Sequence, residues 1–275
     1  MNEVSLSGSS SLAVDATVSV QSLSAQEVLE VWERGRDQAP VEKALTLLAA
    51  ACPGTSPDTL ALLSIGQRDA YLIELREKLF GSRLTSLTDC PECGERLEMT
   101  FSVSDVCASS KAEPASIVPT AMLPGTMLSV NRAGYELQLR LPNSLDLLTL
   151  AGSEGQAEMR ERLFEKCVRS ARHNGRNQSV LTAEMPNEVI EAAIEQIARA
   201  DPQADVQVDL TCPCCSHEWQ AGFDIVSYLW SELHARATNL LREIHLLASA
   251  YGWRESEILS MSARRRESYV EILVG

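Results

Sequence analysis

Two stretches of the sequence decide the fold: residues 90–101 read CPECGERLEMTF, and residues 212–223 read CPCCSHEWQAGF. The two stretches align without a gap, with cysteine on cysteine at their first and fourth positions and phenylalanine on phenylalanine at their last. Each copy is a C-P-x-C turn followed by alternating apolar and polar residues. This pattern predicts a tight knuckle that leads into a β-strand.

The paired knuckles predict a metal site. Each knuckle presents two thiolates, and two knuckles supply the four sulfurs of a closed tetrahedral zinc site. The pairs of a compact ribbon are about 15–20 residues apart, whereas here residues 94–211 lie between them. We therefore expect a split zinc ribbon with one structural Zn²⁺ per chain and with a subdomain inserted between the knuckles. The expected ligands are Cys90, Cys93, Cys212 and Cys215.

The second knuckle leaves the choice of ligand open. Cys214 lies inside it and His217 lies just beyond it, so either could replace a ligand, although the alignment with the first knuckle favours Cys212 and Cys215. A redox pair is the alternative use of a C-x-x-C turn, but it needs a βαβ context and a single copy would suffice. Disulfides are not expected, because nothing marks the chain as secreted. The remaining cysteines are isolated and are expected to be small buried residues: Cys52, Cys107 and Cys167.

Composition restricts the partners. The 275 residues include 24 Lys and Arg against 38 Asp and Glu, a net charge of −14. Such a surface repels phosphates, which argues against nucleic acid, and favours protein partners. The N-terminus has neither a basic residue nor a sustained apolar run, and no stretch reaches the roughly 18 apolar residues of a membrane helix. We expect a chain in the cytoplasm, without a membrane partner and with reduced thiols.

The pattern of helices and strands predicts an α+β fold that is mostly α-helical. Capping boxes at Ser24 and Ser64 open two helices of an N-terminal region, and a further helix is expected from Met159 to Ala171. A long helix with apolar residues at steps of three, four or seven follows the second knuckle. The expected organisation is a disordered tail (1–23), an N-terminal helical region (24–85), the split zinc ribbon (86–107 and 206–225), an inserted α/β subdomain (108–205) and a C-terminal helical docking module (226–275).

No catalytic motif is present in the sequence. It lacks a G-x-S-x-G elbow, a P-loop, a G-x-G-x-x-G turn and an H-E-x-x-H pair. A zinc ion held by four thiolates has no open position and activates no water. We therefore expect a protein that is not an enzyme and has no small-molecule substrate.

The C-terminal 30 or so residues have the composition of a binding surface. Trp, Tyr and Arg, the residue types enriched at interface hot spots, gather near the chain end, where segments are usually polar and mobile. The alternative is that this segment folds back on the long helix and that Trp253 is core. The candidate partner-binding residues are Tyr251, Trp253, Arg264, Arg265, Arg266 and Tyr269.

Several stretches carry a family resemblance. Residues 244–273, IHLLASAYGWRESEILSMSARRRESYVEIL, are similar to the end of the phage T4-type baseplate hub assembly chaperones of contractile tails and contractile injection systems. LSIGQRDAYLIELREKLFG, CPECGERLEMTF and LRLPNSLDLLTLAG resemble the injection-system branch. The resemblance implies a non-catalytic factor that binds baseplate and hub proteins, found in the cytoplasm or associated with the virion or injection particle. Two alternatives stay open: a structural baseplate subunit retained in the particle, and a nucleic-acid-binding zinc ribbon.

Overall fold

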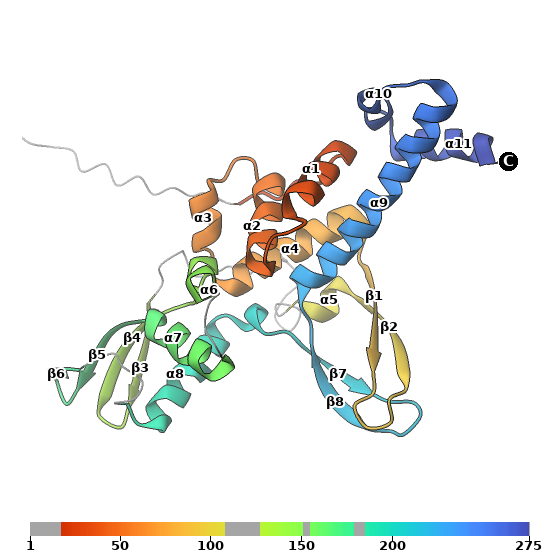
Figure 1. Cartoon of the computed structure of the whole chain (residues 1–275). Coiled ribbons are helices and arrows are strands. Elements are labelled where there is room, and N and C mark those ends of the chain that lie inside the picture. The colour runs from red at the N-terminus through yellow and green to blue at the C-terminus, as the bar shows by residue number, and fades with distance from the viewer. Residues whose placement is uncertain (1–17, 108–126, 151–154, 179–184, 275) are drawn as a thin grey trace, which may run out of the picture.

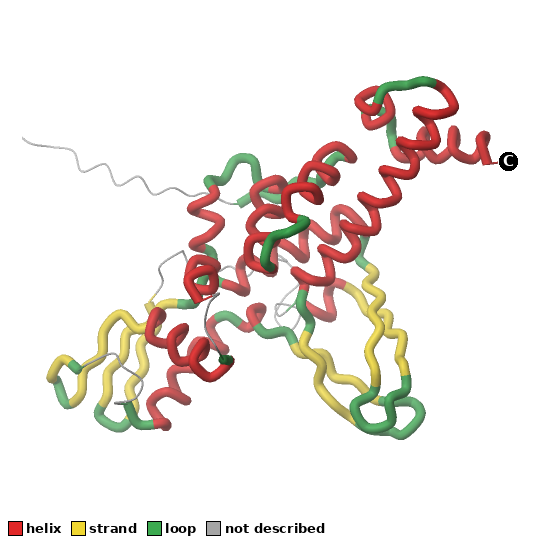
Figure 2. Tube along the Cα trace, viewed as in Figure 1, coloured by secondary structure: helices red, strands yellow, loops and turns green. Residues whose placement is uncertain are grey.

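The computed structural model describes residues 18–107, 127–150, 155–178 and 185–274. It confirms an α+β fold in which small sheets project from a helical body (Figures 1 and 2). The body combines four N-terminal helices with the first part of the long helix α9, which packs against α1, α2 and α4. Its helices are α1 (Ala25–Gly35), α2 (Pro40–Ala51), α3 (Pro57–Leu62), α4 (Ile65–Phe80) and α9 (Ile225–Tyr251).

The two capping boxes predicted at Ser24 and Ser64 are confirmed. The Ser24 side chain caps α1 in a reciprocal capping box with Glu27, and Ser64 caps α4 with Gln67 in the same way. Pro40 is the first residue of α2, where its missing N–H costs no helical hydrogen bond. Gly81 ends α4 with a φ of +83°, a conformation that favours glycine.

The N-terminal tail begins to pack before its expected end at residue 23. Val20 and Leu23 are buried in the core of the body, and the Gln21 N–H donates a hydrogen bond of 2.8 Å to the Ala51 carbonyl at the end of α2. Residues 18–23 are therefore part of the folded body, and the rest of the expected tail, 1–17, lies outside the described residues.

Two antiparallel ribbons extend from the body to meet at their turns (Figure 1). The first consists of β1 (Arg83–Asp89) and β2 (Arg96–Ser102), and the second of β7 (Gln207–Thr211) and β8 (Glu218–Gly222). Both show strict alternation of exposed and half-buried residues over most of their length, as expected for strands with one covered face. The first ribbon ends at Ser102, earlier than the sequence predicts, because a short helix α5 (Val103–Val106) follows at once.

The inserted segment has a core of its own. Its four-stranded sheet has the order β3-β4-β5-β6, and its helices α7 and α8 pack against β5 and against β3 and β4 respectively. The sequence Arg132-Ala133-Gly134 between two alternating apolar stretches predicts a hairpin, and the structure confirms it, with positive φ at both Ala133 and Gly134. The elements are β3 (Met127–Arg132), β4 (Tyr135–Arg140), α6 (Ser144–Leu150), α7 (Gln156–Cys167), β5 (Val168–His173), β6 (Arg176–Asn177) and α8 (Asn187–Ala200).

The predicted helix from Met159 to Ala171 is wrong in its last turn. Helix α7 ends at Cys167, and the following residues form β5, which pairs with β4. Leu163, Phe164 and Cys167 lie at helical spacing, and Val168 extends that pattern by one residue. Pairing with a neighbouring strand overrides the local period here, because it satisfies the main chain and buries Val168 and Ala171.

The end of the inserted segment belongs with the body. Asp201, after α8, accepts a hydrogen bond of 2.9 Å at Oδ2 from the Gly66 N–H in the first turn of α4. Gln203, in the short 3₁₀ helix η3 (Pro202–Ala204), donates one of 3.0 Å to the Val106 carbonyl. Both side chains are buried. The expected boundary at residue 205 therefore cuts off residues 201–204 from the region against which they pack.

The C-terminal part of the chain continues α9 away from the body (Figure 1). Gly252 ends α9 in the left-handed conformation with a φ of +68°, and α10 (Glu255–Leu259) and α11 (Ala263–Val274) fold back against its distal half. None of the helices in the described part of the chain is long and apolar enough to span a membrane.

Candidate metal centre

The two knuckles have the same main-chain geometry. In the first, the Cys90 N–H donates to the Glu95 carbonyl and the Gly94 N–H donates to the Cys90 carbonyl, both at 2.9 Å. In the second, Cys212 and Ser216 make the two equivalent hydrogen bonds, again at 2.9 Å. Gly94 and Ser216 both have positive φ, of +73° and +57°. The aligned sequence positions therefore build equivalent turns, and each turn directs two cysteine side chains to one side.

The four cysteines that the sequence predicts as ligands come together. The Cys90 and Cys215 sulfurs are 3.7 Å apart, the Cys93 and Cys212 sulfurs are 3.6 Å apart, and all four lie within 4.8 Å of one another. A tetrahedral site with Zn–S bonds of about 2.3 Å has S–S edges of about 3.8 Å. The donor set and its spacing therefore fit a zinc ion, and the described residues offer no second cluster of this kind.

The electrostatics of the cluster favour a bound cation. The backbone N–H of Cys215 lowers the pKa of the Cys212 thiol to about 7, against an opposing effect of burial. The Glu95 N–H acts in the same direction on Cys93, but burial and the neighbouring sulfurs outweigh it and raise the pKa of Cys93 to about 12. Four thiols this close cannot all ionise unless a positive charge offsets their repulsion. A divalent cation supplies that charge.

The two alternative ligands are left outside the cluster. Cys214 is exposed and is not among the sulfurs that converge. The His217 ring stacks against Trp219, with ring centroids 5.9 Å apart and the planes inclined by 19°. Cys52, Cys107 and Cys167 are buried, as expected of isolated small apolar residues.

A second cluster, of aromatic residues, lies where α10 and α11 meet the end of α9. The Tyr251 and Trp253 rings stack with centroids 4.4 Å apart, and Tyr269 meets Trp253 edge-on at 5.0 Å. The Arg265 guanidinium lies 5.7 Å from the centre of the Tyr269 ring. Tyr251 is exposed and Trp253 is half-buried. The structure thus brings together four of the residues that the sequence predicts as a binding surface: Tyr251, Trp253, Arg265 and Tyr269.

Arg266 is not part of this surface, contrary to the sequence prediction. Its side chain is 2% exposed, and its Nε donates to the Glu243 carboxylate of α9 at 2.8 Å. A second hydrogen bond of 2.6 Å runs from Nη1 to the Met261 carbonyl. Arg264 and Arg265 are exposed. One member of the arginine triplet therefore fixes α11 to α9, because successive residues of a helix point in different directions.

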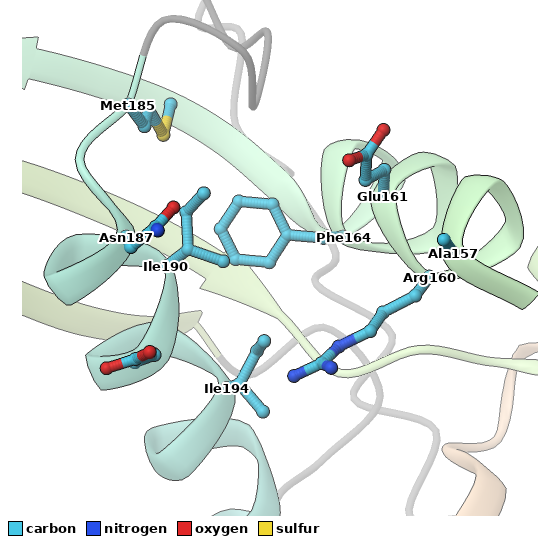
Figure 3. Close-up of a pocket in the computed structure, with 9 residues that line it drawn as sticks. Ala157, Arg160, Glu161, Phe164, Met185, Asn187, Ile190 and Ile194 are labelled. Atoms are coloured by element: carbon cyan, nitrogen blue, oxygen red, sulfur yellow. The ribbon is translucent and has the colours of Figure 1, made fainter.

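A groove of about 440 Å³ lies between α7 and α8 of the inserted segment (Figure 3). The Phe164 ring points into it, Met185 is buried beside it, and Ile190 and Ile194 line its α8 side. Arg160 is exposed and extends across the groove toward Ile194. The groove is thus an apolar trough with a charged rim, on elements that carry none of the four clustered cysteines.

Fold and site together define the class: an α+β protein with a helical body and a four-cysteine cluster that joins two β-ribbons. The family model described as T4 bacteriophage base plate protein matches residues 18–230, and the chain belongs to that family. The matched region contains both knuckles and the inserted segment, and it ends within α9. No curated protein and no solved structure matches the chain.

Proposed function

We propose that the chain is a non-catalytic assembly factor for the baseplate hub of a contractile tail or a related injection system. Membership of the base plate family supports a role at the baseplate. The observation that carries the finer proposal is the placement of the two clusters. The cysteines lie at the joined ends of the ribbons and the aromatic residues lie at the far end of α9, so both project from the body (Figure 1).

The proposed role of the metal is structural. Cys90, Cys93, Cys212 and Cys215 would hold one zinc ion and make the two ribbons a split zinc ribbon. With four protein sulfurs the ion keeps no open position for water or substrate. Binding of the ion closes a long loop of chain, and that closure contributes to folding. The chain's own residues then serve to position surfaces rather than to transform a substrate.

The proposed partners are other baseplate proteins, bound partly through the aromatic cluster. Exposed Tyr251 stacks on the half-buried Trp253, and exposed Arg265 lies over the neighbouring Tyr269 ring. The cluster therefore combines an apolar centre with a polar rim. The net charge of −14 does not favour nucleic acid as a partner. An affinity for DNA or RNA that persists at physiological salt would support the alternative of a nucleic-acid-binding ribbon.

Abundance at each assembly stage tests the proposal against its main rival, a subunit retained in the particle. Quantitative mass spectrometry of hub intermediates and of finished particles measures copies of the chain per copy of a known baseplate subunit. An assembly factor is enriched in the intermediates and depleted from finished particles. A constant whole-number ratio in both samples would identify a structural subunit instead.

A further inference from the structure

The hydrogen bonds at the two ends of the first ribbon fix which main-chain groups point out of it. The Val103 N–H donates to the Ser82 carbonyl, and the Cys90 N–H donates to the Glu95 carbonyl, both at 2.9 Å. In an antiparallel pair, hydrogen-bonded positions alternate with positions whose N–H and C=O point away from the partner strand. With the register of this ribbon, the residues of β2 that point away are Arg96, Glu98, Thr100 and Ser102.

The other edge of the ribbon is covered at Thr85. On β1 the same alternation turns Thr85 outward, and the Tyr228 hydroxyl of α9 occupies both of its groups. The Thr85 N–H donates to that hydroxyl at 2.9 Å, and the hydroxyl donates to the Thr85 carbonyl at 3.0 Å. On β2, Asp105 accepts from the Ser102 N–H. Within the described chain, the main-chain groups of Arg96, Glu98 and Thr100 have no such protein partner, so β2 presents an open edge from Arg96 to Thr100.

The open edge forms one wall of a groove of about 590 Å³. Residues 95–99 line one side, and Thr211 at the end of β7 lines the other together with Pro213 and Cys214 of the second knuckle. Leu97 and Met99, on the covered face of β2, are only half-buried. The register of the second ribbon also turns the main chain of Thr211 away from β8. Hydrogen-bonding groups and apolar side chains therefore share one groove.

We propose that this groove receives an extended segment of a baseplate protein, which pairs with β2 as an added strand; the inference rests on the proposed function. An extended segment offers the free N–H and C=O groups that the edge lacks, whereas a helix uses its own internally. A two-stranded ribbon is marginal by itself, and a third strand would extend its apolar face.

The charge of the ribbons defines the chemistry of the partner segment. Residues 83–107 and 206–224 carry eight carboxylates and two arginines, a net charge of −6. The segment is therefore basic, with Lys or Arg opposite Glu98 and an acidic residue opposite Arg96. A second copy of the chain is disfavoured as occupant, because it carries the same net charge of −14.

The test uses the full chain co-expressed pairwise with each other baseplate protein of the same system. The complex that forms is compared with the free chain by residue-resolved hydrogen exchange and by affinity. The amides of Arg96, Glu98 and Thr100 are expected to exchange at least about tenfold more slowly in the complex. Glu98→Pro removes an outward donor, and its ring obstructs strand pairing, so affinity is expected to fall at least about tenfold.

Gln220→Pro on β8 is the matched control, because Gln220 is an exposed outward position of the other ribbon and leaves the groove unchanged. Metal content shows that both variants fold. If the Glu98→Pro variant still binds the baseplate protein, and if exchange on β2 is not slowed in the wild-type complex, the groove is not the binding site. The proposed function is left intact by that result. Binding to no baseplate protein overturns both. Self-association of the free chain that Glu98→Pro abolishes identifies a second copy as the occupant and overturns the partner assigned here.

Discussion

Arg266 of α11 and Glu243 of α9 form a nearly buried ion pair, with Nε and Oε2 2.8 Å apart. The pair is the polar anchor of the C-terminal helices, because Arg266 also holds the Met261 carbonyl in the turn before α11. It fixes α11, which carries Tyr269, against α9, which carries Tyr251.

Arg266→Ala is expected to loosen α10 and α11 from α9. It leaves the Glu243 carboxylate unpaired at a largely covered position, and we expect a loss of about 2 kcal/mol in the stability of this region. Hydrogen exchange of α10 and α11 measures the change. Arg264→Ala is the control, since Arg264 is exposed and its loss should change stability by less than about 0.5 kcal/mol. Equal exchange in both variants would show that the ion pair does not hold the helices.

Arg265→Glu is expected to abolish binding of the baseplate partner while the melting temperature stays nearly unchanged. Arg265 is exposed and touches only the face of Tyr269 within the aromatic cluster, so it contributes little to folding. Pairwise co-purification and thermal unfolding measure the two effects. Arg242→Glu reverses the charge of an exposed arginine on α9, outside the aromatic cluster, and should leave binding intact.

Trp253→Ala separates docking from packing at the same cluster. Trp253 is half-buried and contacts both Tyr251 and Tyr269. We therefore expect its replacement to lower the free energy of unfolding by about 1–2 kcal/mol, less than the ~3–5 kcal/mol expected for a fully buried tryptophan. Unfolding by denaturant measures it. Unchanged co-purification of the hub proteins with both Trp253→Ala and Arg265→Glu, both folded, would rule out this surface.

Asp201→Asn is expected to change how stability depends on pH. Burial raises the pKa of Asp201, although the Gly66 N–H, Ser64 and Arg68 partly oppose it. The folded state therefore binds a proton at Asp201 more readily than the unfolded state does. As a consequence, the wild type gains stability as the pH falls from above the folded-state pKa toward the unfolded-state pKa of about 4. Asn keeps the acceptor for Gly66 but does not titrate.

The wild type should therefore gain stability relative to Asp201→Asn between neutral and mildly acidic pH. Denaturant unfolding at a series of pH values measures this difference. Asp205→Asn, at an exposed carboxylate four residues on, is the control. Parallel pH profiles for the wild type and Asp201→Asn would contradict a buried, titrating Asp201.

Replacement of residues 108–200 by a short Gly/Ser linker should leave a folded chain that still gathers its four cysteines. The inserted segment has its own core, and this variant keeps Asp201 and Gln203, which pack on the body. A variant that lacks residues 108–205 should be less stable than the variant that lacks 108–200, because the Gly66 N–H and the Val106 carbonyl then lose their hydrogen-bond partners. Circular dichroism and metal content compare the two. If the variant that lacks only residues 108–200 is unfolded and free of metal, the inserted segment and the body form one folding unit.

The sequence predicted the features that rest on local chemistry. Capping boxes at Ser24 and Ser64, the turn at Ala133–Gly134 and the paired knuckles are all encoded within a few residues. The convergence of the four cysteines could be predicted because the second knuckle repeats the first. Each of these signals needs no knowledge of what lies across the fold.

Features that rest on distant contacts could not be predicted. Arg266 has its partner on another helix, and nothing in the run of three arginines distinguishes it from Arg265. β5 has a helical apolar period and becomes a strand only because β4 lies beside it. The cover that Tyr228 gives to Thr85 joins residues that no sequence spacing relates. In all three cases the structure is decided by a contact with a residue far away in the sequence, and not by the local sequence.

The metal content of the purified chain is the most direct test of the proposed four-cysteine zinc site. Native mass spectrometry and elemental analysis should find one zinc per chain in the wild type and in Cys214→Ser. They should find none in Cys93→Ser or Cys215→Ser, which should also lose much of their stability. Full zinc content in Cys215→Ser together with none in Cys214→Ser would contradict the site that the four converging sulfurs define.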